Sequence, residues 1–270
     1  MPPIISPSSR LDYRRVPSHR AVSHFLDHIV AGMFPCLGDN GYTQQPDGEA
    51  LRREMLALLS SFDSVSCRAE DCSKAFFAGL QEVYEAVLFD AQAICAGDPA
   101  AGHIEEVILA YPGFYAILVY RLAHLMHRLH IPVIPRMFTE NAHRHTGIDI
   151  HPGARIGKSF CIDHGTGIVI GETTVIGDEV KIYQGVTLGA SSVSKEKAGK
   201  KRHPTLEDKV IVYSGSTILG GDTLIGHHSI IGGNVWLTHS VAPYSLVINR
   251  SEVHLIDKNP QDGNVLDFVI

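Results

Sequence analysis

The residues best suited to chemistry are Asp163 and His164, which interrupt the segment FCIDHGTGIVIG at 160–171. Apolar and polar residues alternate in this segment as in a strand, but the acid, the histidine and three glycines break the alternation. An imidazole beside a carboxylate can take a proton from a hydroxyl near neutral pH, because the unperturbed pKa of histidine is about 6.5. The pair is either the working part of an active site or a polar corner of an ordinary β-structure.

A six-residue repeat surrounds this pair and predicts how the chain positions it. Aliphatic residues recur at every sixth position in three runs: Ile150, Ile156 and Ile162; Ile170, Ile176, Ile182 and Leu188; and Leu219, Ile225 and Ile231. The pattern is typical of a parallel β-helix, in which each unit supplies one short strand and one turn and the aliphatic side chains stack inside a prism. A β-sandwich would instead alternate with period two between turns.

The repeat is broken at two places, and each break contains a histidine. The step from Ile162 to Ile170 is eight residues, so two extra residues fall at 163–167. The step from Leu188 to Leu219 is thirty-one residues, and the polar stretch 190–209 predicts an extruded loop. A regular solenoid loses packing where its period breaks, so we expect function at both places.

Helical periodicity precedes the repeat, so helices are expected to cover the first end of the solenoid. Amphipathic patterns predict helices near 21–33, 49–62, 73–97, 112–131 and 135–147, with Gly97 and Gly147 at two of the ends. The expected organisation is a loosely ordered arm at 1–47, an α-helical domain at 48–146, a catalytic β-helix at 147–257 and a flexible tail at 258–270.

Composition limits the class of protein. The 270 residues carry a formal net charge of −6, and KEKAGKKRH at 195–203 is the only basic cluster, so nucleic-acid binding is not expected. Five cysteines form no CxxC motif, and neither a signal peptide nor an apolar stretch of about 18 residues is evident, which favours a cytoplasmic protein with reduced thiols. Sixteen histidines favour proton transfer or metal binding without deciding between them.

Three motifs together resemble those of a known enzyme family. DIHP at 149–152, DHGTGIVIGET at 163–173 and RHP at 202–204 are similar to motifs of the serine O-acetyltransferases, and the similarity runs from about Asp98 to Pro243. The resemblance implies an α+β fold class, with an α-helical N-terminal domain followed by a left-handed parallel β-helix. It also implies a homotrimer, or a hexamer of two trimers paired through the helical domains.

The resemblance further implies transfer of acetyl from acetyl-CoA to the hydroxyl of L-serine, giving O-acetylserine for cysteine biosynthesis. His164 matches the general base, and Asp149 matches the carboxylate paired with it, two coils back on the same edge. Such a carboxylate fixes the tautomer of the imidazole and stabilises the imidazolium, as in a Ser-His-Asp triad. Direct transfer in a ternary complex is implied, with no metal.

The same resemblance implies the substrate-binding residues. Asp98 and Asp163 match carboxylates that hold the ammonium of serine, and Arg202 and His203 match residues that contact its carboxylate from the loop of a neighbouring subunit. The acetyl-CoA arm is expected in a groove between two β-helices, near four positions: Thr187, Gly189, Ser214 and Gly232.

The C-terminal part of the chain carries one departure from the family pattern and one further similarity. Asn249–Val253 replaces a segment that helps to hold CoA in the family, so the contacts to the CoA phosphates stay open. The ending DFVI at 267–270 is similar to that of plant members, and many members insert a terminal isoleucine into O-acetylserine sulfhydrylase. We therefore expect the sulfhydrylase as a partner, bound through the terminal carboxylate of Ile270.

Three other functions compete with this interpretation. The same scaffold could acetylate another acceptor, such as an amino sugar or homoserine. A hydratase of the carbonic anhydrase type would need three histidines around zinc, and only His164 and His203 are available. A non-catalytic subunit that only binds the sulfhydrylase is the third. Asp149 and Asp98 also have plain interpretations as turn residues, and Cys161 is expected to be packed rather than nucleophilic.

Overall fold

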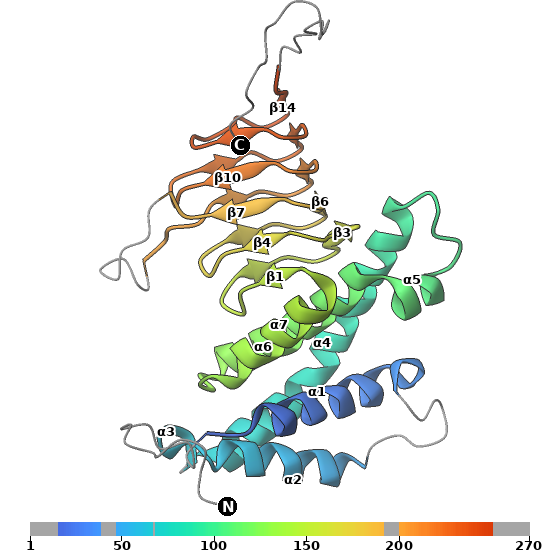
Figure 1. Cartoon of the computed structure of the whole chain (residues 1–270), viewed down its shortest axis with the longest axis vertical. Coiled ribbons are helices and arrows are strands. Elements are labelled where there is room, and N and C mark those ends of the chain that lie inside the picture. The colour runs from blue at the N-terminus through green and yellow to red at the C-terminus, as the bar shows by residue number, and fades with distance from the viewer. Residues whose placement is uncertain (1–15, 39–46, 67, 192–199, 251–270) are drawn as a thin grey trace, which may run out of the picture.

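A computed structural model describes residues 16–38, 47–66, 68–191 and 200–250, and Figure 1 shows a solenoid of strands standing on a layer of helices. The helices in chain order are α1 (His19–Met33), the 3-10 helix η2 (Pro35–Leu37), α2 (Gly48–Leu59), α3 (Asp63–Ser66), α4 (Ala69–Gly97), α5 (Ile104–Ala110), α6 (Pro112–Arg128) and α7 (Ile134–Thr146).

The longer helices form where apolar residues recur at helical spacing. In α2, the four residues of the predicted apolar face are all buried: Leu51, Met55, Leu58 and Leu59. Gly147 ends α7 with a left-handed φ of 71°. The sequence did not predict α5, because seven residues are too few to show a period. No single described helix is long and apolar enough to cross a membrane. Helices α5 and α6 meet the length and hydropathy criteria only when they are taken together, and a 76° bend separates them.

The β region is a left-handed parallel β-helix, which confirms the predicted fold class. Every strand pairs in parallel with the strand one coil away, and the strands form the three faces of a prism. Sheet A contains β1 (Asp149–Ile150), β4 (Val169–Ile170), β7 (Thr187–Gly189), β10 (Thr217–Leu219) and β13 (Trp236–Leu237). Sheet B contains β2 (Arg155–Ile156), β5 (Val175–Ile176), β8 (Thr205–Leu206) and β11 (Leu224–Ile225). Sheet C contains β3 (Cys161–Asp163), β6 (Lys181–Tyr183), β9 (Ile211–Val212), β12 (Ile230–Ile231) and β14 (Leu246–Val247).

The structure corrects the sequence register of the third run. Ile218 is the inward residue of β10, where Leu219 was expected, and it pairs with Leu188 of β7. The step from Ile218 to Ile225 is seven residues, because the turn after β10 holds one residue more than the repeat allows. Counting back in sixes from Ile225 therefore reached the wrong residue.

The repeat also resumes earlier than expected. Leu206 of β8 and Val212 of β9 are both buried in the prism, so the solenoid has already restarted inside the stretch 190–209 that was expected to be loop. Charged turn residues at 207–209 lie between them, and this polarity hid the period. Within that stretch, 192–199 lies outside the described residues.

One corner of the prism is a column of left-handed residues. We call the turn from sheet C to the next strand of sheet A the C–A corner, and the turn from sheet A to sheet B the A–B corner. Successive C–A turns stack through backbone hydrogen bonds, such as Gly185 N–H to the Thr166 carbonyl (2.9 Å). Gly147 before β1 and one stacked residue in each C–A turn have φ between 55° and 82°: Gly147, Gly167, Gly185, Gly215 and Asn234.

A buried ion pair joins the helices to the first coil. Asp90 of α4 accepts hydrogen bonds from Arg121 Nε (2.5 Å) and Nη2 (2.8 Å) of α6, and from the backbone N–H of Phe160 (2.9 Å). Arg121 also donates to the carbonyls of Ile156 and Gly157. Helices and solenoid therefore share one polar network at their boundary.

Candidate active site

His164 lies at the C–A corner that closes the first coil. Its turn, 164–168, is two residues longer than the matching turn of the next coil, as the broken repeat predicted. The backbone is left-handed at His164 (φ 58°), the side chain is 74% exposed, and Nε2 lies 3.6 Å from Asp163 Oδ1. A Cβ on Gly165 would lie 2.5 Å from Ile148 Cδ1, so glycine is needed for this turn to pack. The ring thus projects from a fixed corner beside the carboxylate of Asp163.

Asp98 reaches the same place from the helical layer. It follows α4, and its carboxylate accepts hydrogen bonds from the Tyr111 hydroxyl (2.6 Å) and the Ala100 N–H (2.8 Å). These two bonds lower the pKa of Asp98, and Lys181 and His164 are close enough to lower it further. The bond to ionised Asp98 in turn raises the pKa of Tyr111 to about 12. Asp98 is therefore an anion near His164.

Lys181 of β6 links these groups, although no sequence pattern singled it out. Its ammonium donates to the Gly97 carbonyl (2.6 Å) at the end of α4 and pairs with Asp163 Oδ2 at 2.9 Å. It also lies 4.6 Å from the centre of the Tyr183 ring. Burial opposes the charged form, but hydrogen bonds with Tyr183 and Asp163 outweigh burial and raise the pKa of Lys181. Lys181 is therefore a permanent cation in the site.

The pairing of Asp149 with His164 stays a prediction, and the structure records another partner for each. Asp149 belongs to the coil that His164 closes, so it is not two coils away, and it is the first residue of β1. Its carboxylate pairs with Arg136 of α7 at 3.1 Å. Among the described residues, the carboxylate partner of the His164 ring is its neighbour Asp163. The motif match gives the positions of Asp149 and His164 in the fold, but the contact with Arg136 depends on how α7 packs against β1.

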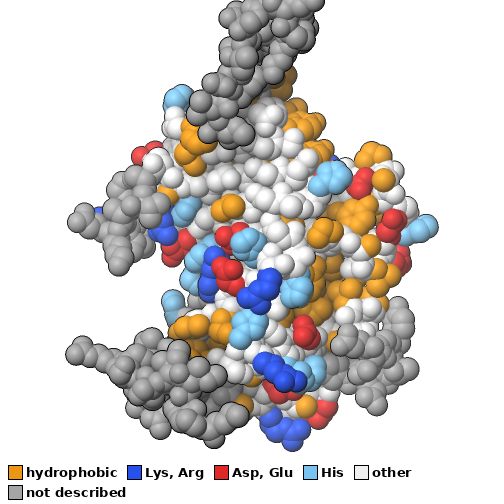
Figure 2. All heavy atoms as spheres, viewed as in Figure 1, with side chains coloured by type: hydrophobic (Ala, Val, Ile, Leu, Met, Phe, Trp, Pro, Cys, Tyr) orange, Lys and Arg blue, Asp and Glu red, His pale blue; other side chains and the backbone are white. Residues whose placement is uncertain are grey.

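Arg202 and His203 lie at an A–B corner, where the chain returns to the solenoid. The Thr173 hydroxyl accepts hydrogen bonds from the backbone N–H groups of Arg202 (2.9 Å) and His203 (3.1 Å). The Arg202 guanidinium pairs with Glu172, while its Nη1 is buried and has no hydrogen-bond partner among the described residues. A Cβ on Gly171 would lie 2.0 Å from the His203 ring, so this glycine makes room for the imidazole. Figure 2 shows charged and histidine side chains gathered where the lower coils meet the helices.

His203 is held in its neutral form. The ring is buried (8% exposed), and Nδ1 accepts a hydrogen bond from the Thr173 backbone N–H at 3.1 Å. Burial, followed by the charge of Arg202, lowers the pKa of His203 to about 4. Since Nδ1 is the acceptor, Nε2 carries the proton and can donate to an anion.

Comparisons with known proteins identify the family. No protein-family model matches the chain. A Synechococcus elongatus relative named serine acetyltransferase, plasmid, is 50% identical over 194 residues, which are 70% of this chain and 60% of the relative. A Helicobacter pylori serine acetyltransferase is 50% identical over 137 residues, which are 51% of this chain and 77% of the relative.

Solved structures agree with these relatives. The structure of serine acetyltransferase isoform 3 from Entamoeba histolytica, in complex with cysteine, superposes with a TM-score of 0.77 at 33% identity and covers 88% of this chain and 85% of that one. A serine acetyltransferase in complex with CoA gives a TM-score of 0.60 at 25% identity, over 84% and 94% of the two chains. The chain belongs to the serine acetyltransferase family.

The chain spans 60% of the length of the Synechococcus relative, so what serine acetyltransferases do as whole proteins is carried to it only as a proposal. The fold divides the site residues that the family predicts into two groups. Asp98, Asp163 and His164 gather at a C–A corner, whereas Arg202 and His203 lie at an A–B corner. His164 and His203 therefore occupy different corners of one chain.

Of the four positions predicted for acetyl-CoA in a serine acetyltransferase, three lie at or beside C–A turns. Ser214 and Gly232 belong to C–A turns above His164, and Thr187 begins the strand after such a turn. Gly189 lies at the other edge of sheet A, where its carbonyl accepts a hydrogen bond from Gly220 N–H (3.1 Å). The predicted partner-binding residue Ile270 and most of Asn249–Val253 lie outside the described residues.

Sequence reasoning from the serine acetyltransferase motifs missed Tyr111 and Lys181. Nothing in the local sequence marks Tyr111, which contacts Asp98 only because α6 begins there. Lys181 had a usable signal: β3 and β6 are one coil apart, so Lys181 and Asp163 are diagonal neighbours on one face of sheet C. Glu172 and Thr173 were already part of the DHGTGIVIGET motif, although no role was given to them.

Proposed function

We propose that this chain is a serine O-acetyltransferase, which transfers acetyl from acetyl-CoA to the hydroxyl of L-serine and so supplies O-acetylserine for cysteine biosynthesis. The convergence of His164, Asp163 and Asp98 from solenoid and helices at one corner carries the proposal. A base with an exposed ring and two carboxylates beside it suits a hydroxyl nucleophile that also bears an ammonium group.

In the proposed reaction, serine and acetyl-CoA are bound together and His164 Nε2 takes the hydroxyl proton. The serine oxygen attacks the thioester carbon, the carbon–sulfur bond breaks, and the imidazolium returns the proton to the CoA sulfur. Asp163 Oδ1, 3.6 Å from Nε2, stabilises the imidazolium. The family match gives this task to Asp149, so Asp149→Asn and Asp163→Asn together decide which carboxylate serves the base.

Serine is proposed to bind through both of its charges. Its ammonium would lie between the carboxylates of Asp98 and Asp163. Its carboxylate would meet Arg202, whose Nη1 is a buried donor without a partner, and His203, whose Nε2–H is free to donate. Because these two groups lie at different corners of one chain, the second group must come from a neighbouring copy. A three-fold assembly, alone or doubled into a hexamer, brings an A–B corner of one prism against a C–A corner of the next.

A CoA-release assay tests the proposal. Serine should be acetylated in preference to a panel of homoserine and amino sugars, and His164→Ala should lower kcat about a hundredfold or more. His228→Ala is the matched control, because His228 is also exposed at a solenoid corner with a left-handed φ of 58°. Turnover of His164→Ala near that of His228→Ala, or preference for another acceptor, would overturn the proposal.

The partner and the location are proposed on the family resemblance alone. O-acetylserine sulfhydrylase would bind the terminal carboxylate of Ile270, and the complex would form in the cytoplasm. A synthetic peptide of the last ten residues should bind the sulfhydrylase, and amidation of its C-terminus should abolish binding. Equal binding of the amidated peptide would contradict capture of the carboxylate.

A further inference from the structure

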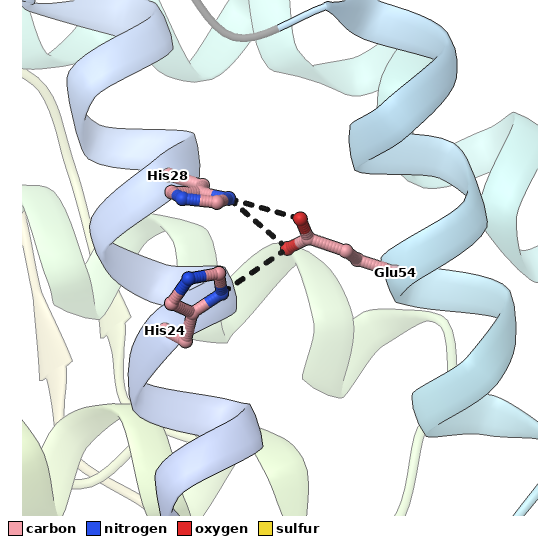
Figure 3. Close-up of side chains that lie close together, drawn as sticks. All are labelled: His24, His28 and Glu54. Atoms are coloured by element: carbon pink, nitrogen blue, oxygen red, sulfur yellow. Dashed lines mark hydrogen bonds and ion pairs between the residues drawn. The ribbon is translucent and has the colours of Figure 1, made fainter.

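We infer that His24, His28 and Glu54 form a site for a transition-metal ion on the helical layer, outside the active site. His24 and His28 are one turn apart on α1 and so share one face of the helix, and Glu54 faces them from α2 (Figure 3). No motif of the proposed acetyl transfer includes these residues.

The ligand atoms are close to the spacing that a metal needs. His28 Nδ1 lies 2.9 Å from Glu54 Oε1, and His24 Nδ1 lies 3.8 Å from Glu54 Oε2. One ligand atom from each residue lies within 4.8 Å of the others. Zinc binds nitrogen and oxygen at about 2.0–2.1 Å with tetrahedral angles, which puts two ligands about 3.3–3.4 Å apart. Shifts of the side chains below 1 Å, on the order of a rotamer adjustment, would close the site.

The charges favour a cation at this place. Among the described residues, the ion-pair partners of Glu54 are His24 and His28, and because a metal binds neutral imidazoles, the three ligands together would offer the ion one negative charge. A second group of similar shape, Glu140 with His143 and Asp149, is filled already, because the Arg136 guanidinium pairs with both carboxylates.

The site would keep an open coordination position. His24 and Glu54 line a cavity of about 440 Å³ between α1 and α2. Arg20 also lines the cavity, so the fourth ligand would be water or a small anion rather than a further side chain. The donor set of two imidazoles and one carboxylate suits Zn²⁺ and also Co²⁺ or Ni²⁺. A bound ion would tie α1 to α2.

Calorimetric titration of the chelator-treated full chain with Zn²⁺ tests the site, with Co²⁺ absorption as a second readout. Removing a residue that only hydrogen-bonds a metal ligand weakens metal binding about 10–100-fold. Glu54 is itself a proposed ligand, so Glu54→Gln should weaken Zn²⁺ binding at least that much. The double variant His24→Ala/His28→Ala should lose one site, whereas the control His227→Ala/His228→Ala should keep it. Equal binding by the wild type and the His24/His28 variant, or no tetrahedral Co²⁺ spectrum in the wild type, would overturn the inference.

A second inference rests on the proposed function and on a different observation. The geometry points to Lys181 as a positioning residue that sets the distance between Asp98 and Asp163 around the substrate ammonium. Its ammonium holds Gly97, the residue before Asp98, and at the same time Asp163 Oδ2, so one side chain ties the end of α4 to sheet C. A cation is favoured at the C-terminal end of a helix such as α4.

Lys181 also sets the charge of the site. Its side chain is only 16% exposed, so solvent screens its charge poorly. The carboxylates of Asp98 and Asp163 and the ammonium of Lys181 together carry a net charge of −1. The ammonium of a bound serine would neutralise this charge. Lys181 engages Asp163 Oδ2, which leaves Oδ1 to face His164 Nε2 and the substrate. Without Lys181, the two carboxylates would repel each other and separate.

Steady-state kinetics of Lys181→Met and Lys181→Arg test this role. Lys181→Met should raise the KM for serine about tenfold or more through loss of a charge-assisted contact, with little change in kcat or in the KM for acetyl-CoA. Lys181→Arg should restore much of the serine KM. A lower serine KM in Lys181→Met would show competition for the carboxylates, and equal losses with both substrates would show a general structural role; either result overturns the inference. A wild type that does not acetylate serine refutes the proposed function instead.

Discussion

Replacing Asp90 should destabilise the fold strongly, because its carboxylate is the buried charge that pairs with Arg121 in their shared network. Asp90 is fully buried, and the Arg121 side chain is 11% exposed. Asp90→Ala removes two charged hydrogen bonds and leaves both the guanidinium and the Phe160 N–H without this acceptor. Breaking a buried pair by removing one partner costs about 3–5 kcal/mol of unfolding free energy.

One feature of the network limits the expected loss for Asp90→Ala, and a double variant tests its cause. The carbonyls of Ile156 and Gly157 still receive hydrogen bonds from Arg121, which limits the loss. Removing both charges should be milder, since a buried ion pair replaced by apolar groups is often neutral. The double variant Asp90→Ala/Arg121→Leu should therefore lose less than the sum of its two single variants.

Urea denaturation followed by far-UV circular dichroism measures these differences, at one protein concentration for all variants. A shift of the midpoint at constant slope reports a change in stability. Asp71→Ala, an exposed acid in the first turn of the same helix, is the control and should shift the midpoint little. A loss below about 1 kcal/mol for Asp90→Ala, or full additivity in the double variant, would refute the reasoning about an unpaired buried charge.

Three further predictions follow from single contacts. Gly113→Ala should lower the free energy of unfolding by about 1–3 kcal/mol, because the added Cβ would lie 2.8 Å from the Ile162 carbonyl oxygen. Gly48→Ala is the control, because a Cβ at Gly48 would meet no atom within 4 Å. Equal urea midpoints for the two variants would contradict this prediction. Folding lowers the pKa of His203 from about 6.5 to about 4, so the folded chain favours the neutral ring. The free energy of unfolding should therefore fall by up to about 3 kcal/mol as the pH drops from about 6.5 to 4. His203→Gln should flatten that pH dependence. Cys161 is buried and its pKa is raised to about 12 by burial, so a thiol reagent should miss it in the folded chain and count it only after denaturation; native-state labelling lost in Cys161→Ser would disprove this.

The fold was largely predictable because each coil of a solenoid repeats the same pattern of residues in the sequence. Each coil reuses six-residue steps, so the aliphatic positions around Ile170 and Ile182 identify the prism directly. The register failed at Ile218, where one extra turn residue breaks the count without changing composition. The expected packing of Cys161, in contrast, is confirmed, since alternation within one short strand is a local property.

The site was predictable where a motif fixes the backbone and unpredictable where side chains from distant segments meet. The break at 163–167 marked the corner that bears His164. The contact of Asp149 with Arg136 depends on how α7 lies against the first strand, and that is a matter of tertiary packing. For the same reason the sequence could not show Tyr111 on Asp98, since thirteen residues and a change of helix separate the two.

The loop between β7 and β8 starts and ends at the A–B corner, and the strands before and after it keep their pairing. β7 still pairs with β4 and β10, and β8 still pairs with β5 and β11. The length of this detour is thus uncoupled from the interior, and doubling a flexible loop costs only about 0.6 kcal/mol. Evolution or a protein engineer can lengthen, shorten or exchange it without repacking a single coil, while Thr173 still holds Arg202 and His203 at the corner.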